Sequence, residues 1–236
     1  MVKKAFLDKE LNNKFNLTSA NSINVARWLP QAFYYFYAVK KLKKKNLVFS
    51  VPSGNFGNIC AGIIAMKLGL PIDHFVASTN VNDTIPRYFK SKVLSPKPTI
   101  QTISNAMDVS NPSNFIRIQE MFENFDTLSS FLSSYSFDDY QTLEIVKEIY
   151  NNKNYIMDPH GAVGYLGLKK YLKNKPNKIG VFLETAHPIK FSKHIENTID
   201  VKLKIPKKIN KILSKNKKYI DIENYNDFKK KILNMF

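Results

Sequence analysis

The sequence contains a single cysteine, Cys60, and lacks any long apolar run. One cysteine cannot form an intrachain disulfide, which is typical of a reducing compartment, so we predict a cytoplasmic location. The most apolar stretch, residues 28–39, carries Pro30 and Gln31 and is shorter than the roughly 20 residues that a bilayer requires. Residues 1–14 are charged and lack the apolar segment of a signal peptide. We therefore predict no membrane partner, and we interpret Cys60 as a buried small hydrophobe rather than a nucleophile.

Arginine is also scarce, although the chain is strongly basic. The 36 basic residues against 19 acidic ones give a formal charge of +17, yet only Arg27, Arg87 and Arg117 are arginines. Proteins that read nucleic-acid sequence prefer arginine, and no helix-turn-helix, zinc-binding or RNA-binding signature accompanies the charge. We interpret the lysines as a solvated surface and predict no nucleic-acid partner and no metal site. A basic nucleic-acid-binding module is retained only as an alternative.

A glycine-bracketed turn is the strongest local motif. Residues 47–51 have the β-branched and aromatic pattern of a strand, and the turn that follows, Gly54-Asn55-Phe56-Gly57-Asn58, leads into a helix. Glycine lets the main chain approach an anion closely, and the first N–H groups of a helix point at it with the positive end of the helix dipole. The turn therefore indicates a phosphorylated ligand, although such turns also occur as ordinary strand-to-helix connections.

Two further polar clusters follow expected strands in the same way. Residues 79–87 come after a strand at 74–78, and residues 184–191 come after a strand at 179–183. The carboxyl ends of parallel strands form one edge of a sheet, where such sheets bind ligands. We therefore expect Gly54, Asn80 and Thr185 to lie at one edge, close enough to share a pocket.

The alternation of strands and helices predicts an α/β fold, a parallel sheet flanked by helices. A chain of 236 residues with 44% hydrophobic content can bury a sizeable core. The helix expected at 21–45 carries an aromatic face, which we predict packs in the core rather than stacking on a ligand: Phe33, Tyr34, Phe36 and Tyr37. Further helices are expected at 57–69, 84–92, 113–124, 137–152, 160–173 and 187–198, with short helices in the tail from Asp200.

Five segments in this order resemble threonine synthase of the enteric bacterial and fungal type: residues 21–27, 51–58, 79–87, 104–114 and 185–191. The resemblance extends from about residue 15 to residue 205 and covers only the C-terminal portion of such an enzyme. It implies the tryptophan synthase β-subunit-like pyridoxal-phosphate fold (fold type II), incomplete at the N-terminus. It also implies a division into a cofactor-binding core region, residues 1–205, and a lysine-rich helical tail of the same domain, residues 206–236.

The resemblance implies a pyridoxal 5'-phosphate enzyme, a phospho-lyase of threonine biosynthesis that converts O-phospho-L-homoserine and water to L-threonine and phosphate. The family's glycine loop holds the cofactor phosphate, which here assigns Gly54, Asn55, Phe56, Gly57 and Asn58 as cofactor-binding residues. Its threonine that contacts the pyridine nitrogen corresponds to Thr185, a residue that could instead cap a helix. No lysine here lies in a motif that matches the family's Schiff-base lysine, so we expect that residue outside this chain.

Candidates for substrate binding also come from the family pattern. The substrate carries a phosphate and a carboxylate, which suit arginine forks and hydroxyl or amide donors. The candidates are Ser22, Asn24, Arg27, Asn80, Asn82, Asp83 and Arg87. We rank Arg117 below them, because its segment could serve packing alone, and we interpret His187 as a helix cap rather than a residue that orients a loop.

Two functional hypotheses follow. In the first, the chain is the cofactor-binding half of a threonine synthase, active when joined to or assembled with a separate chain that supplies the lysine. In the second, it is an inactive remnant that binds a partner half or nothing. A sister phospho-lyase acting on a related amino acid is compatible with the same motifs.

Overall fold

The computed structural model describes residues 1–235 and divides by its internal contacts into two compact units. The larger unit comprises residues 21–204, and the smaller unit combines residues 1–20 with residues 205–236. The membership of the lysine-rich tail in the same domain as the core stays a prediction. Within the described residues, no helix is long and apolar enough to span a membrane.

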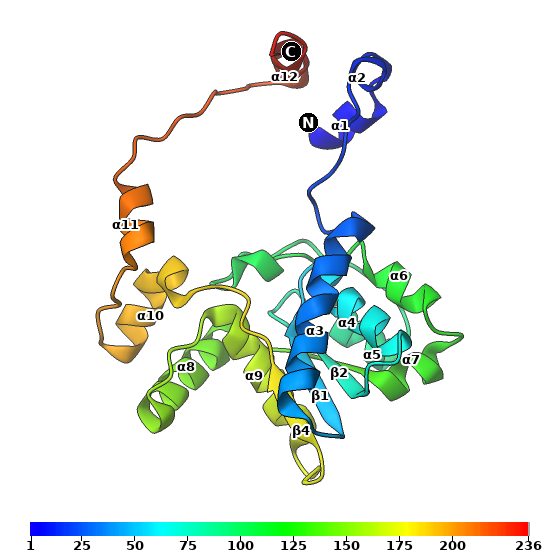
Figure 1. Ribbon diagram of the computed structural model, residues 1–236, viewed down its shortest axis with the longest axis vertical. Coiled ribbons are helices and arrows are strands. Elements are labelled where there is room, and N and C mark those ends of the chain that lie inside the picture. The colour runs from blue at the N-terminus through cyan, green and yellow to red at the C-terminus, as the bar shows by residue number, and fades with distance from the viewer. Residues whose placement is uncertain (236) are drawn as a thin grey trace. The chain divides into compact units, whose positions relative to one another are not determined.

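The larger unit is built on a four-stranded sheet in which every neighbouring pair is parallel (Figure 1). The predicted α/β fold class is therefore confirmed. The strand order is β3-β2-β1-β4, so the first strand in sequence lies inside the sheet. The strands are β1 (Leu47–Pro52), β2 (Ile72–Thr79), β3 (Leu132–Ser136) and β4 (Ile179–Phe182).

Helices cover both faces of the sheet, as the alternating side chains of β1 require. Phe49 and Val51 belong to the main core with α3 (Trp28–Leu42) and α4 (Gly57–Lys67). Val48 belongs to a second cluster with Val76 and with Leu168 of α9 (Pro159–Leu172). Since β1 is buried at every position, its carboxyl end is fixed in place from both sides.

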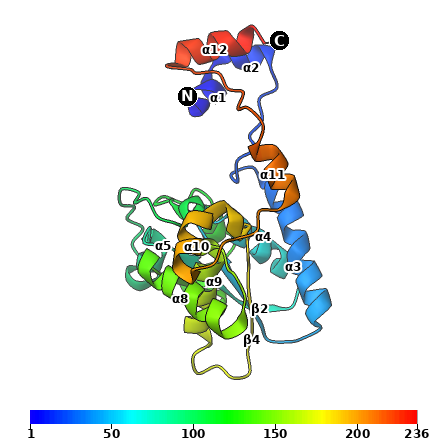
Figure 2. The same ribbon diagram turned by 90° about the vertical axis from the view of Figure 1, so that its left-hand side faces the viewer.

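The remaining helices pack around this layer structure. α10 (Ser192–Ile199) and α8 (Asp139–Lys153) lie side by side (Figure 2). They share an apolar cluster that contains Ile145 and Ile195. A capping box of Asp138 and Gln141 begins α8. The other elements of the larger unit are α5 (Thr84–Ser91), α6 (Phe115–Glu120), α7 (Phe125–Phe131), and the short 3₁₀ segments η1 (Val25–Arg27), η2 (Asn105–Met107) and η3 (Pro188–Phe191).

Two sequence expectations about α3 are wrong. The helix begins at Trp28 rather than Asn21, because the Asn24 side chain accepts the N–H of Ala26 and caps η1 instead. Its aromatic face is mostly exposed: Phe33 and Tyr37 are 68% and 62% exposed. The core-facing positions are Trp28, Ala32 and Tyr35, which recur at helical spacing.

The region between α5 and α8 also departs from expectation. The helix predicted at 113–124 corresponds to the shorter α6, and α7 follows it outside the predicted range. The edge strand β3 was not predicted, because its sequence, Leu-Ser-Ser-Tyr-Ser, has few of the β-branched residues that mark strands. It pairs with β2 from Phe75 to Thr79 and thereby extends the sheet.

The smaller unit contains α1 (Val2–Leu7), α2 (Lys9–Lys14), α11 (Lys207–Leu213) and α12 (Tyr225–Leu233), which confirms short helices in the tail. The two chain termini meet through polar contacts. Lys229 forms ion pairs with Asp8 at 2.9 Å and Glu10 at 2.7 Å, and the Tyr225 hydroxyl donates to Asp8. The hydrogen bonds from Lys229 and then Tyr225 lower the pKa of Asp8 to about 2.

Candidate functional site

The glycine loop lies against an open cavity of about 780 Å³ at the carboxyl ends of β1 and β4. All six residues predicted to bind a cofactor line this cavity. They are joined there by two of the seven substrate candidates, Ser22 and Arg27. The cavity belongs entirely to the larger unit. Its lining residues outside the prediction are Gln31, Tyr34, Pro52, Ser53, Ala106, Met107, His160, Leu183 and Glu184.

The loop offers a series of backbone donors to this cavity. Within residues 1–235, the N–H groups of Gly54 to Asn58 donate to no acceptor of the protein. The loop is anchored on either side, because Ser53 N–H donates to Ser78 O at 2.8 Å and Cys60 N–H donates to Phe56 O at 3.0 Å. Five consecutive donors at the start of α4 form a site suited to an anion with several oxygens.

Close packing explains the two glycines. A Cβ on Gly54 would lie 2.7 Å from the carbonyl oxygen of Ala106 and 2.8 Å from the Cα of Met107. A Cβ on Gly57 would lie 3.0 Å from the Cβ of Ser22. Neither glycine has a positive φ, so space rather than dihedral angle requires them. Phe56 between them does adopt the left-handed region, with φ of 62°, and its buried ring packs edge-on against Phe115.

The two asparagines of the loop use their side chains to hold the loop in place. Asn55 Nδ2 donates to Ser22 Oγ at 2.9 Å, and its Oδ1 accepts the N–H of Ser113 at 2.7 Å. Asn58 Oδ1 accepts from the hydroxyls of Tyr34 and Tyr35. These contacts fix the loop from α3 and from the segment before α6, and they leave its backbone N–H groups without a protein acceptor beside the cavity.

A second wall follows β4 and carries Leu183, Glu184 and Thr185. Thr185 is exposed, and its hydroxyl makes no hydrogen bond with any other described residue. The cap before Pro188 is supplied by His187, whose Nδ1 accepts the N–H of Ile189 at 3.1 Å, so the prediction of His187 as a cap is confirmed. The Thr185 hydroxyl is consequently available to a ligand.

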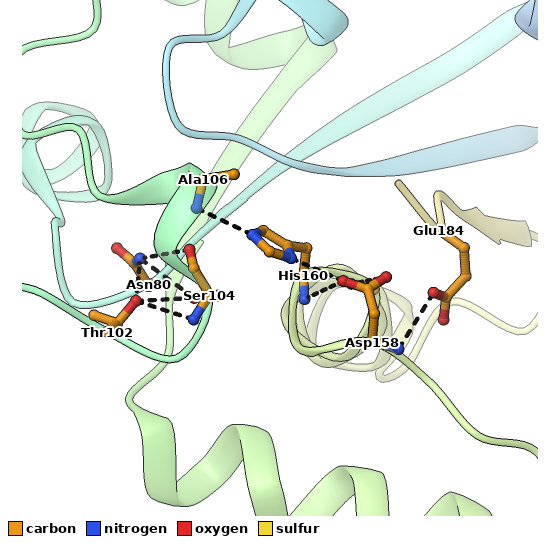
Figure 3. A network of polar contacts seen from close by, with 8 residues as sticks. Asn80, Thr102, Ser104, Ala106, Asp158, His160 and Glu184 are labelled. Carbon is orange, nitrogen blue, oxygen red and sulfur yellow. Dashed lines mark hydrogen bonds and ion pairs between the residues drawn. The ribbon is translucent and has the colours of Figure 1, made fainter. Parts of the chain in front are cut away.

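Sequence reasoning missed a cluster of titratable side chains beside the cavity (Figure 3): His160 and Glu184 line the cavity, and Asp158 hydrogen-bonds to both of them. Asp158 caps the start of α9 and accepts from the ring Nδ1–H of His160 at 2.8 Å. Burial and then a hydrogen bond with Asp158 raise the pKa of Glu184 to about 9. Burial also acts to raise the pKa of Asp158, but hydrogen bonds from His160 and Glu184 outweigh it and hold that pKa below its ordinary value. The Asp-Pro-His-Gly sequence at a helix start was the available signal.

The remaining substrate candidates do not line the cavity. Asn80 Nδ2 donates to Thr102 Oγ1 at 2.8 Å and to Asp108 Oδ1 at 2.9 Å. Asn82 bonds to Asn80 and to the backbone of Ile100. Asp83, just before α5, forms an ion pair with Arg87 of that helix at 2.8 Å, and Asn24 caps η1. The expectation that Asn80 shares a pocket with Gly54 and Thr185 therefore has no support in the cavity lining, and a role in substrate binding stays a prediction for these five residues.

Two other expectations concern residues beneath the site. Cys60 is fully buried, with its Sγ 3.6 Å from the carbonyl oxygen of Asn114, and burial raises the pKa of its thiol to about 12. It is therefore a packing residue, as predicted. Arg117 donates to Ile23 O at 2.6 Å and lies over the Trp28 ring, contacts that agree with its lower rank as a ligand residue.

Comparison with known proteins identifies similar chains. A family model described as "Threonine synthase, C-terminal" matches residues 161–232. The chain is 48% identical over 214 residues to the threonine synthase of Haemophilus influenzae, a match that covers 89% of this chain and 50% of that protein. The chain thus spans about half the length of the curated relatives it matches.

Solved structures agree. The crystal structure of threonine synthase from Escherichia coli has a TM-score of 0.83 at 44% identity, covering 89% of this chain and 49% of that one. The structure of PLP-bound threonine synthase from Brucella melitensis has a TM-score of 0.89 at 28% identity, covering 99% of this chain and 56% of that one. The predicted resemblance and the predicted fold are therefore confirmed.

Proposed function

We propose that this chain, which matches the C-terminal part of threonine synthases, forms the phosphate-binding side of a pyridoxal 5'-phosphate site in such an enzyme. The reaction is the conversion of O-phospho-L-homoserine and water to L-threonine and phosphate. The observation that carries the proposal is the row of backbone donors from Gly54 to Asn58: these residues line the cavity, and their N–H groups have no acceptor in the described protein.

The residues present fit this cofactor at both ends. A phosphate dianion needs several donors and a close approach of the main chain, and the loop provides both. The exposed Thr185 hydroxyl lies on another wall of the same cavity and is suited to the pyridine nitrogen. Bound in this way, the cofactor would supply an electron sink for chemistry at the substrate carbons, and a neutral hydroxyl partner would make that sink milder than a carboxylate partner would.

Arg27 and Ser22 are the substrate candidates best placed for this role. Both line the cavity, and a guanidinium recognises phosphate or carboxylate through paired N–H groups. Ser22 also accepts from Asn55, which couples this wall to the glycine loop. We propose that these two residues bind the substrate and that the candidates after β2 support the site from a distance.

The catalytic lysine of the proposed reaction must come from another segment, because no lysine of the described residues lines the cavity. We infer that activity requires the complementary part of a threonine synthase, either covalently joined or supplied as a separate chain. The location of such an enzyme would be cytoplasmic, in keeping with one buried, unreactive cysteine.

Titration of the chain with pyridoxal 5'-phosphate, pyridoxal and inorganic phosphate tests the proposal. We expect weak, non-covalent binding of pyridoxal 5'-phosphate, competition by inorganic phosphate, and much weaker binding of pyridoxal, because the loop donors act on the phosphate. Thr185→Val should weaken pyridoxal 5'-phosphate and leave inorganic phosphate unaffected. Equal affinity for pyridoxal and its phosphate would contradict the assignment of the loop.

Addition of the complementary half tests the reaction. We expect it to produce the absorbance of a lysine-bound cofactor and the release of phosphate from O-phospho-L-homoserine. Gly54→Asp should abolish both, because it places a carboxylate against the cofactor phosphate. Phosphate release by this chain alone would contradict an external catalytic lysine, and no release by the mixture would favour an inactive remnant.

A further inference from the structure

The buried Asp158–His160 pair has a defined hydrogen-bond direction. Asp158 is fully buried, and its Oδ1 accepts both the backbone N–H of His160 at 2.9 Å and the ring Nδ1–H at 2.8 Å. With the Nδ1 proton held by Asp158, the other ring nitrogen is an acceptor. That Nε2 lies 3.2 Å from the backbone nitrogen of Ala106, whose N–H it accepts (Figure 3).

Ala106 belongs to a short segment, residues 104–107, that we call the strap. The strap contacts the glycine loop directly, because the Ala106 carbonyl oxygen and the Met107 Cα occupy the space where a Gly54 side chain would begin. Its first residue, Ser104, is held from the other side by Asn80. The strap is therefore fixed between a polar network after β2 and the ring of His160 on α9.

We propose that Asp158 and His160 are positioning residues for the anion site: Asp158 fixes the tautomer of His160, and the imidazole holds the strap against the glycine loop. The expected effect on phosphate binding rests on the proposed function, whereas the contact between His160 and the strap does not. The hydrogen bond from Ala106 to Nε2 requires the Nδ1–H tautomer, because a proton on Nε2 would bring two N–H donors face to face. Release of the strap would let the loop move away from the geometry in which its donors converge.

The surroundings of His160 match this role. Its ring is buried and lies 5.1 Å from the ring of Phe191, which limits its rotation. The titratable groups near it are Asp158, which caps the start of its helix, and Glu184 after β4, which hydrogen-bonds to Asp158. Glu184 Oε2 accepts the backbone N–H of Asp158 at 3.4 Å, and the carboxyl lies where a Gly161 side chain would begin. Glu184 therefore packs against the start of α9 from the cavity side.

The chain offers a matched pair of variants, because glutamine and asparagine imitate different ring nitrogens. In His160→Gln, the side-chain oxygen reaches the place of Nε2 and can still accept from Ala106. In His160→Asn, the amide reaches only as far as Nδ1, so the bond to the strap is lost. We expect amide exchange at Ala106 to become about tenfold faster in the asparagine variant and to stay within about threefold of the wild type in the glutamine variant.

The proposal is tested first by nitrogen NMR of the ring in the full chain, with amide exchange at Ala106 measured beside it. We expect Nδ1 protonated and Nε2 unprotonated at neutral pH, and Asp158→Asn should increase the population of the opposite tautomer. A ring protonated at Nε2 in the wild type, or equal rates of amide exchange at Ala106 in the two His160 variants, would overturn the proposal that His160 holds the strap. These readings involve no ligand, and the wild-type spectrum decides even where a variant does not fold.

Binding of inorganic phosphate then tests the consequence. We expect His160→Asn to raise the phosphate dissociation constant about tenfold relative to the wild type. In His160→Gln the dissociation constant should stay close to the wild-type value, because this variant keeps the hydrogen bond to Ala106. Equal phosphate affinity in both variants would overturn the link between strap and loop. Absence of phosphate binding by the wild type would contradict the proposed function. The NMR result alone would then decide whether His160 holds the strap.

Discussion

Two polar clusters follow the adjacent parallel strands β1 and β2, and their hydrogen bonds are used differently. After β1, the side chains of Asn55 and Asn58 are bound to the surrounding protein, while the backbone donors of their loop lie beside a cavity and have no protein acceptor. After β2, Asn80 and Asn82 bond to each other and to residues 100–108, so their polar atoms are satisfied within the protein. The cluster after β1 therefore keeps donors that no protein group uses, whereas the cluster after β2 uses its side-chain amides within the protein.

The comparison shows that residue type at the edge of a sheet does not by itself identify a ligand site. Both clusters are rich in asparagine and both follow buried strands. They differ in whether donors are left over once the local structure has formed, and this depends on the segment that packs above each cluster. Over the loop lies the cavity, whereas over Asn80 lie Thr102, Ser104 and Asp108.

Gly54→Ala should have the largest effect. The added methyl group would meet backbone atoms of the strap at 2.7 and 2.8 Å, and backbone cannot turn away as a flexible side chain can. We expect a loss of about 1–3 kcal/mol in the free energy of unfolding and a reduction of phosphate affinity of at least about tenfold. Urea denaturation and phosphate titration measure the two effects.

Gly164→Ala is the matched control. A methyl group there would lie 3.4 Å from Pro52 Cδ, an ordinary contact, and it stands inside α9, where alanine is favoured over glycine by about 1 kcal/mol. We expect unchanged or increased stability and unchanged phosphate affinity. Unchanged phosphate binding by Gly54→Ala would contradict the conclusion that the loop after β1 is an anion site.

Asn80→Ala should have the second largest effect, and the effect should be on the stability of the fold. It removes buried hydrogen bonds to Thr102 and Asp108 and leaves the Asp108 carboxylate with fewer donors. We expect a loss of about 2 kcal/mol in the free energy of unfolding, with phosphate affinity changed less than about threefold. Asn151→Ala, on the exposed side of α8, should leave both unchanged. A large loss of affinity without a loss of stability would show that Asn80 contacts a ligand.

The sequence predicted the sheet and the loop because their causes are local. Strands β1, β2 and β4 are apolar and β-branched, and close neighbours leave room only for glycine at positions 54 and 57. Strand β3 escaped prediction because it is rich in serine and becomes a strand through pairing with β2. The end of α3 nearest the cavity was misplaced because a side-chain cap on η1 stops the helix at Trp28.

The rest of the site depends on contacts between distant segments. His160 reaches the strap because α9 packs across the sheet, a contact that joins residues 54 positions apart and has no local signature. The same applies to the candidates after β2, because the sequence shows that Asn80 can donate but not that Asp108 accepts. Aromatic periodicity on α3 likewise predicted a buried face and could not show which neighbours would cover it.

Glu184→Gln extends the comparison to the end of a third strand, β4, where burial and Asp158 raise the pKa of a carboxyl group. The pKa of Glu184 is raised in the folded chain to about 9, so folding favours its neutral form. The stabilisation is complete below the ordinary pKa of a glutamate and is lost as pH rises toward 9. Because part of Glu184 is exposed to the cavity, solvent screening reduces the effect. Urea denaturation between pH 5 and pH 8.5, about the accessible window of this shift, should show wild-type stability falling relative to the variant. Parallel curves would contradict a raised pKa.

Arg87→Gln should have the smallest effect. It tests the segment after β2 at an exposed position. Arg87 pairs with Asp83 at 2.8 Å and donates to the carbonyl oxygen of Ser95 at 2.7 Å, but both charged side chains are partly exposed, at 24% and 32%. Partly exposed pairs contribute little, so we expect a loss of about 0.5 kcal/mol in the free energy of unfolding. A double-mutant cycle with Asp83→Asn should assign most of that loss to the pair. Phosphate affinity of the chain should not change, since Arg87 does not line the cavity. A marked fall in phosphate affinity, together with no coupling energy between Arg87 and Asp83 in the cycle, would show that Arg87 contacts the ligand. The segment after β2 would then be part of the ligand site, like the loop after β1.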